Sequence, residues 1–284
     1  MAAVKNTETA VQKSAPLPPP AMVIDYGGDV GAGFENQSQS DMLIPRLVVL
    51  QALSPQCSDR EDCRPGMLWN TVTETPVSGT KGVVFVPATT KHLWNEWVPR
   101  EKGGGMAGQH APEATVVRQA IAQSREFGKY NTPNGNQLVE TFDIYAVLLD
   151  ENNQPESMAV ISFTSAKIKV YKQFNTKLNM FTVKAPDGRK VRPPLFAHKV
   201  RLVTVKEKNN KGEFYVFDLQ PADGSVAESL LPPGHAALEA AKELRSVVDR
   251  GEVKVADENS ASHREAPIDA DVVSDTNNST GWNA

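Results

Sequence analysis

Alternating apolar and polar residues dominate the middle of the chain and predict strands. From 199 to 206, charged or polar residues alternate with Val and Leu, the period-two pattern of a strand with one face buried. Asn209-Asn210-Lys211-Gly212 then carries the signal of a hairpin turn, and 213–219 reads as the returning strand. Further β-rich runs bounded by Gly, Pro or turn residues indicate strands at 67–72, 82–87, 93–98, 139–149 and 158–163, and a short apolar element spans 43–50.

Two segments have the spacing of amphipathic helices, one at 113–126 and one that follows Pro232-Pro233-Gly234 and stops at Gly251. Near one face lie Val117, Ile121 and Ser124 in the first segment, and Leu238, Ala241, Leu244 and Val248 in the second. Six to eight short strands with two helices, and no strand–helix alternation, argue against a parallel α/β sheet. We therefore predict a mainly β (α+β) fold, an OB-like antiparallel barrel or sandwich with peripheral helices and disordered termini.

Composition changes at both ends of the chain. Residues 1–40 are first Pro-rich and then Gly-rich, which is typical of an extended and then flexible linker. From Gly251 to Ala284 there are seven Asp or Glu against two basic residues, among many Ser, Asn and Ala. Such a segment buries too little apolar surface to offset its ordering entropy. The sequence thus predicts a disordered arm at 1–40, a β-rich nucleic-acid-binding core at 41–250 and an acidic disordered tail at 251–284.

Positive charge is concentrated in one part of an acidic chain. The protein has 30 Lys or Arg and 34 Asp or Glu, a formal net charge of −4, yet Val160 to Glu213 holds thirteen Lys or Arg against three acids. Aromatic residues are interleaved with these cations. Cations attract a phosphate backbone through counterion release, and aromatic faces stack exposed bases. The segment therefore predicts a groove for single-stranded nucleic acid.

The residues expected to form this groove fall into two chemical groups. Lysine and arginine side chains follow a phosphate backbone as charges without reading the bases. The expected phosphate contacts are Lys167, Lys169, Lys172, Lys177, Arg189, Lys190, Arg192, Lys199 and Arg201, and the expected stacking residues are Tyr171, Phe174 and Phe181. The basic segments read mainly as strands, with 162–175 as a strand that enters a helix or loop. For each aromatic residue taken singly, a place in the hydrophobic core is the competing interpretation.

The sequence contains no motif of known catalytic chemistry. It has no phosphate loop, nucleophile elbow, zinc-protease helix or dinucleotide fingerprint, so we expect no enzymatic activity, no catalytic residues and no cofactor. Cys57 and Cys63 lack the further ligands of a zinc site, and the five histidines show no metal spacing. We expect free thiols, no metal site, and solvated carboxylates in the polar loop that holds both cysteines.

Several short motifs occur together over roughly residues 41 to 220. They are Asp41-Met42-Leu43-Ile44-Pro45-Arg46, Leu50-Gln51-Ala52-Leu53-Ser54-Pro55-Gln56, Ser162-Phe163-Thr164-Ser165-Ala166-Lys167-Ile168-Lys169, Pro194-Leu195-Phe196 and Asn209-Asn210-Lys211-Gly212. This set resembles a group of tailed-bacteriophage proteins, some of them labelled single-stranded-DNA-binding. It implies an OB-fold-like protein of phage DNA replication or recombination. The acidic end is similar to the tails of bacterial and podophage single-stranded-DNA-binding proteins, although Gly281-Trp282-Asn283-Ala284 departs from their usual ending.

These observations favour a sequence-independent single-stranded-DNA-binding protein. The alternative is a virion structural or decoration protein whose basic face meets packaged DNA or another capsid protein. The expected partners are single-stranded DNA and, through the acidic tail, phage or host replication proteins, while homo-oligomers and RNA binding stay open. No signal peptide or membrane-spanning run is apparent, so we expect no membrane contact and a location in the cytoplasm of the infected bacterial host.

Overall fold

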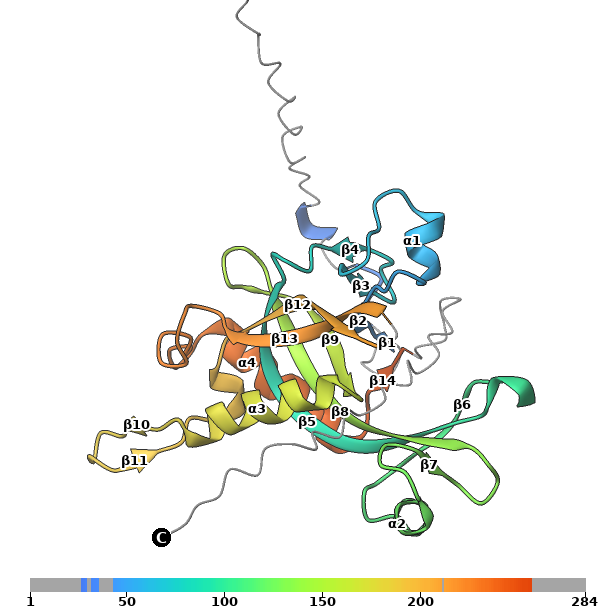
Figure 1. Cartoon of the computed structure of the whole chain (residues 1–284). Helices are drawn as coiled ribbons and strands as arrows, with labels where there is room; N and C mark the ends of the chain where they lie inside the picture. The colour runs from blue at the N-terminus through green and yellow to red at the C-terminus, as the bar shows by residue number, and fades with distance from the viewer. Residues whose placement is uncertain (1–26, 30–31, 36–42, 211, 257–284) are drawn as a thin grey trace, which may run out of the picture. The chain divides into compact units, whose positions relative to one another are not determined.

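The computed structural model describes residues 27–29, 32–35, 43–210 and 212–256 of the chain (Figure 1). These residues belong to two compact units, 1–38 and 39–284. In the first unit, Gly27–Asp29 forms a single 3-10 turn, η1. Most of the predicted disordered arm (1–26, 30–31 and 36–40) and the acidic tail beyond Ala256 lie outside these described ranges.

Ten strands of the second unit form one curled, half-barrel sheet. The strand order is β13-β12-β5-β8-β9-β2-β3-β4, with β6 paired to β5 and β7 paired to β8. Neighbouring strands run antiparallel except β2 and β9, which are parallel. The strands are β2 (Arg46–Val49), β3 (Leu68–Asn70), β4 (Pro76–Val77), β5 (Val83–Trp97), β6 (Met106–His110), β7 (Tyr130–Asn131), β8 (Gln137–Leu149), β9 (Pro155–Thr164), β12 (Val200–Asn209) and β13 (Gly212–Pro221). The mainly β prediction is confirmed, whereas an OB-fold in particular is not.

The described residues of this unit also form two short strand pairs and four α-helices. β1 (Leu43–Ile44) pairs with β14 (Lys254–Val255), and β10 (Val183–Lys184) pairs with β11 (Lys190–Val191). The helices are α1 (Pro55–Asp59), α2 (Thr115–Gln123), α3 (Lys167–Met180) and α4 (Ala236–Arg250), with short 3-10 turns η3 (Arg100–Lys102) and η4 (Leu195–Ala197).

Most predicted strands are present, but two of them are halves of one. The segments 82–87 and 93–98 belong to the continuous, 15-residue strand β5. A register shift between Pro87 and Thr89 accommodates the proline, which cannot donate a ladder hydrogen bond. A proline commonly marks the end of a strand. Pro87 therefore made the sequence predict two short strands where the structure has one.

The two predicted helices exist, and the larger error concerns α3. α4 ends as expected, since Gly251 adopts a left-handed conformation (φ 73°) after it. In α2 the buried residues are Val117 and Ala120, whereas Ile121 is 44% exposed, so the predicted apolar face was partly wrong. The 14-residue helix α3 was read mainly as a strand, because its Lys-Ile-Lys-Val-Tyr start mimics a period-two alternation.

Both faces of the sheet are buried, each beneath a different helix. In β8, Phe142, Ile144, Ala146 and Leu148 face a core that includes Tyr171, Phe174 and Leu178 of α3. The intervening Tyr145, Val147 and Leu149 face a second core that includes Leu238, Ala241, Leu244 and Val248 of α4. Figure 1 shows the two helices on opposite sides of β5, β8 and β9. Burial on both faces explains why β8 is a nearly continuous apolar run.

The curl brings β12 and β13, at one end of the strand order, close to the segments next to β2, β3 and β4 at the other end. Hydrogen bonds from side chains connect the two regions. The amide of Gln51, just after β2, accepts from the Tyr215 N–H (2.9 Å) and donates to the Tyr215 carbonyl (2.8 Å) in β13. Thr204 of β12 donates from its hydroxyl to the Gly66 carbonyl and from its N–H to the Gly79 carbonyl (2.9 Å). Gly66 has φ 86°, and a Cβ there would lie 2.5 Å from the Tyr215 ring, so glycine is required.

A buried ion pair fixes the C-terminal strand to the sheet. Arg46 of β2 lies 3.6 Å from the Asp143 carboxylate of β8, and both side chains are at least 93% buried. Arg46 also donates to the Ser162 hydroxyl of β9 and, from Nε, to the Ala256 carbonyl (3.2 Å). Since Ala256 is itself buried, the core extends to residue 256, and the predicted core boundary at 250 was six residues short.

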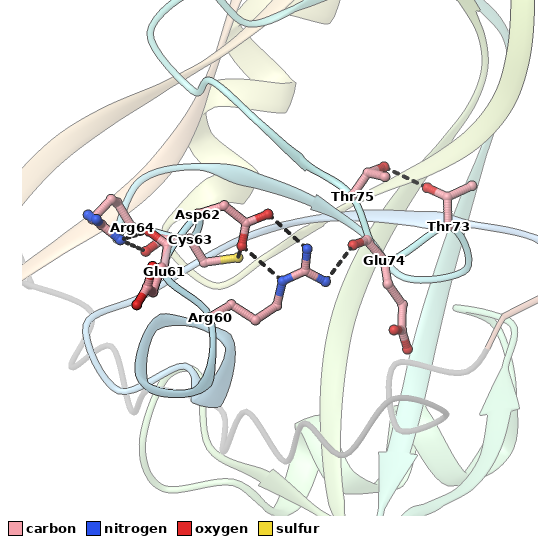
Figure 2. A network of polar contacts seen from close by, with 8 residues as sticks. All are labelled: Arg60, Glu61, Asp62, Cys63, Arg64, Thr73, Glu74 and Thr75. Carbon is pink, nitrogen blue, oxygen red and sulfur yellow. Dashed lines mark hydrogen bonds and ion pairs between the residues drawn. The ribbon is translucent and has the colours of Figure 1, made fainter.

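The segment that holds both cysteines keeps Asp59, Glu61 and Asp62 exposed, as predicted, and buries one of its two thiols. Cys57 lies in α1, and Cys63 is fully buried beside Leu50 and Trp69; both thiols are free. Figure 2 shows the adjoining polar network, in which Arg60 binds both Asp62 carboxylate oxygens (3.0 and 2.8 Å) and the Glu74 carbonyl (3.0 Å). The Arg60 guanidinium also lies 5.2 Å from the Trp69 ring centroid. The Asp62 carboxylate therefore has a fixed partner and shapes the corner between α1 and β3.

Replacing Gln51 with Ala should destabilise the protein because two backbone groups of β13 lose their partner. We expect the free energy of unfolding to fall by about 1–3 kcal/mol, two hydrogen bonds' worth. Chemical denaturation measures this change. The control is Gln123→Ala at the exposed end of α2, expected to change stability by no more than about 0.5 kcal/mol. Equal stability of the two variants would show that the Gln51 amide does not hold the sheet closed.

Candidate nucleic-acid interface

Helix α3 presents cations on its exposed side because its apolar residues follow helical spacing. Tyr171, Phe174 and Leu178 are buried against the sheet. Lys169, Lys172 and Lys177 are exposed, and none of them pairs with an acid among the residues that the structure describes. Three of the nine predicted phosphate contacts thus form an unneutralised basic row on one helix.

The aromatic residues of α3 are not available for stacking. Tyr171 and Phe174 retain only 7% and 5% of their exposure, so their assignment as base-stacking residues was wrong. The helical period of the segment turns both rings inward, which the strand interpretation of the sequence concealed. Phe181, just after the helix, is half-buried with its ring centroid 6.2 Å from that of the buried His198.

The hairpin formed by β10 and β11 continues the basic surface beyond the C-terminal end of α3 (Figure 1). Arg189, Lys190 and Arg192 are exposed on or beside it, as is Lys184, which the sequence-based list left out. Arg189 Nε lies 2.6 Å from the Asp187 carboxylate, and hydrogen bonds from the Arg189 backbone and side chain lower the pKa of that carboxyl. Arg192 donates to the Asn179 side-chain oxygen (2.7 Å), which connects the hairpin segment to α3.

Lysine 167 is the least accessible of the four lysines in α3. It is half-buried, and its ammonium lies 4.8 Å from the centroid of the Phe217 ring. This position favours a cation–π contact at the start of the helix over a free phosphate contact. The Lys172 ammonium lies 5.3 Å from the Phe142 ring centroid, but its side chain stays exposed.

The last two predicted phosphate contacts do not join this surface. Val200 and Leu202 face the core beneath α3, so strand alternation directs Arg201, and Lys199 before it, toward the other face of β12. The Lys199 side chain is only 12% exposed, and its ammonium binds Asp223 (2.7 Å) and Asn153 (3.2 Å). Arg201 is half-buried and donates to the Lys81 carbonyl (3.3 Å). The predicted single groove is therefore wrong in extent: its cations lie on two faces of the sheet.

A narrow apolar crevice lies between α3 and the middle of β5. Its lining includes Pro87 and Thr90 from β5, Asn175 and Leu178 from α3, and Leu195 from η4. Most of the other lining residues, such as Phe85, Tyr171 and Phe174, are buried in the core. The crevice is therefore a small gap in the packing between α3 and the sheet.

Metal-holding clusters and membrane-spanning helices are both absent from the described residues. These residues contain no group of three or more His, Cys, Asp or Glu side chains placed to hold a metal ion. None of their helices combines the length and apolar composition that a bilayer crossing needs. The surface of α3 and the β10–β11 hairpin remains the best-defined candidate site.

Comparison with known proteins gives one result. A family model described as Pam3 phage gp34-like protein matches residues 11–254, which is most of the chain. No curated protein and no solved structure matched.

Proposed function

The chain belongs to the Pam3 phage gp34-like protein family, a bacteriophage family, and we propose that it binds single-stranded DNA without strong sequence preference. In this proposal the protein acts in phage DNA replication or recombination, in the cytoplasm of the infected bacterium. The phosphate contacts are the exposed cations of α3 and the hairpin, Lys169, Lys172, Lys177, Lys184, Arg189, Lys190 and Arg192.

The observation that carries the proposal is the contrast between two surface helices. On α4, each exposed cation has an acidic neighbour: Lys242 with Glu239 (2.9 Å), Arg245 with Asp249 (3.4 Å) and Arg250 with Glu252 (2.8 Å). On α3 the three exposed lysines have no such partner among the described residues. A net-acidic protein that leaves one helix unneutralised accumulates a local positive potential, which attracts a polyanion.

The kind of cation favours a backbone ligand over a specific base sequence. Lysine is a flexible point charge and binds phosphates without the fixed two-pronged geometry that arginine uses on guanine. The surface is one helix and a small hairpin, whose exposed cations can follow the phosphates of a flexible strand without reading its bases. The proposal is therefore single-stranded and sequence-tolerant binding.

Binding should depend steeply on salt and favour single strands. If about five phosphates are neutralised, log K should fall against log salt with a slope of about −3.5, since each single-strand contact contributes roughly 0.7. Fluorescence anisotropy with a labelled oligothymidine and a duplex of equal length, at several salt concentrations, measures both properties. Equal affinity for the duplex, or a slope of zero, would refute the proposed function.

Neutralising Lys169, Lys172 and Lys177 together as Gln should weaken binding for every sequence tested and make the salt slope shallower by about 2, because three contacts are lost. The matched control is Lys242→Gln, Arg245→Gln and Arg250→Gln on α4, which removes the same charge from exposed helical positions. The control should bind like the wild type. Equal weakening by both variants would assign binding to net charge instead of to α3.

Removing the acidic tail should tighten binding at low salt. The truncation should follow Ala256, because β14 and the Ala256 carbonyl hold the fold together. Residues 257–284 carry six acids and one basic residue, and a tethered anion competes with phosphates at high effective concentration. The gain should shrink as salt rises, since exposed charges are screened within about 8 Å at physiological ionic strength.

A full-length variant in which the six acids are Asn or Gln separates charge from chain length. It should bind as tightly as the truncated protein. If the truncated and the neutralised proteins both bind like the wild type at low salt, the tail does not compete with the ligand. If they bind more weakly, the tail promotes ligand binding.

A further inference from the structure

A line of aromatic contacts runs from the core to the surface and ends at His92. The rings of Phe217, Phe163, Tyr171 and Phe142 follow one another at centroid distances of 4.7–5.6 Å. His92 stacks on Phe142 with a centroid distance of 4.2 Å and an interplanar angle of 12°. The four inner rings are at most 9% exposed, whereas the His92 side chain keeps 37% of its surface exposed. His92 is therefore the accessible ring of the series.

Beside His92, one edge of β5 has no paired strand among the described residues. β12 pairs with β5 only from Val83 to Phe85, and β6 pairs with β5 only from Trp94 onward. Between these two pairings, no described strand lies along that side of β5. An extended chain can thus approach the His92 ring without displacing a strand.

The orientation of the His92 ring is fixed before any ligand arrives. Its Nε2 lies 2.9 Å from a Glu140 carboxylate oxygen on the neighbouring strand, and Phe142 supports one face. A ring held from two directions loses little rotational freedom when a ligand stacks on it. The imidazole therefore offers a prepared flat surface.

The exposed cation Lys172 lies within about 10 Å of this ring. The Lys172 ammonium is 5.3 Å from the same Phe142 centroid on which His92 stacks. The His92 ring centroid lies 4.2 Å from the same Phe142 centroid, which sets the upper limit on the separation between imidazole and ammonium. One nucleotide can place its base on the ring and its phosphate on the lysine.

We propose that His92 and Lys172 form a base-binding subsite for one unpaired nucleotide, with the base stacked on the imidazole and the phosphate held by the lysine. The subsite rests on the proposed single-stranded-DNA binding and supplies the stacking contact that the buried Tyr171 and Phe174 do not. Every base has a flat face, so such a contact is sequence-tolerant. The competing role for His92 is a surface pair with Glu140 that stabilises the β5–β8 ladder.

Substitutions of His92 separate these two roles. His92→Ala should weaken oligothymidine binding about fivefold to 100-fold, the range that one base–aromatic stack supplies, while the salt slope stays unchanged because no phosphate contact is lost. His92→Phe, which keeps a flat ring but cannot bind Glu140, should restore affinity to within about threefold of the wild type. A loss in both variants would assign the effect to the Glu140 pair and overturn the subsite.

The matched control is His110→Ala. His110 also binds a glutamate on a neighbouring strand, Glu96 at 2.7 Å, and no aromatic stack involving it is found in the described residues. This variant should bind like the wild type. Thermal unfolding of all three variants, compared with the wild type, checks that each binding change is read on a folded protein.

The outcomes distinguish this inference from the proposed function. If the wild type does not bind oligothymidine, the proposed function and the subsite both fail. If the wild type binds, the α3 triple variant weakens binding and His92→Ala has no effect, the subsite alone is wrong. Irradiation of the wild type with an oligonucleotide containing 5-iodouracil should crosslink the peptide that contains His92, and crosslinks confined to other peptides would contradict the subsite.

Discussion

Closure of the curled sheet is the constraint on which the other features of the fold depend. The described strands do not pair into a closed barrel. Instead, the Gln51 amide takes the place of a strand on the Tyr215 backbone, and Thr204 binds the carbonyls of Gly66 and Gly79. These contacts keep the sheet curved, so that its inner face is wide enough for one helix. α3 fills that space with Tyr171, Phe174 and Leu178. The position of the basic surface is thus a consequence of how the sheet bends.

One side of α3 packs into the core, and this packing holds the helix in place. The exposed side therefore does not have to contribute to the fold. The helix has no acidic residue, so its lysines cannot pair along its own surface as those of α4 do. A helix stabilised only by its own surface would benefit from such i,i+4 pairs. α3 instead obtains stability from apolar packing in the sheet. The charge that it leaves unpaired is available for a ligand, which is the physical basis for assigning function to this side of the molecule.

The sequence predicted what local patterns determine and missed what tertiary structure decides. Alternation and turn residues located β8, β9, β12 and β13, and the capping glycine located the end of α4. The exposed lysines of α3 were identified despite a wrong secondary structure, because long charged side chains reach solvent from either a strand or a helix. Lys199 could not be excluded, since its partner Asp223 is brought to it by the folding of a distant loop. The role of Tyr171 likewise depends on which face of α3 the sheet covers.

His92 illustrates why an accessible ring escaped the sequence-based search. As one of five scattered histidines it has no motif, and its significance comes from the register that places it opposite Phe142 in the β5–β8 ladder. A shift of one residue in that register would turn His92 to the α4 side and place Lys91 beside the aromatic series. A second ladder, β8–β9, aligns Asp143 with Ser162 and allows both to meet Arg46 on the opposite face. The buried ion pair and the exposed imidazole therefore depend on two ladders that share β8. A shift of β8 along its own axis would disturb both, although they lie on opposite faces of the sheet.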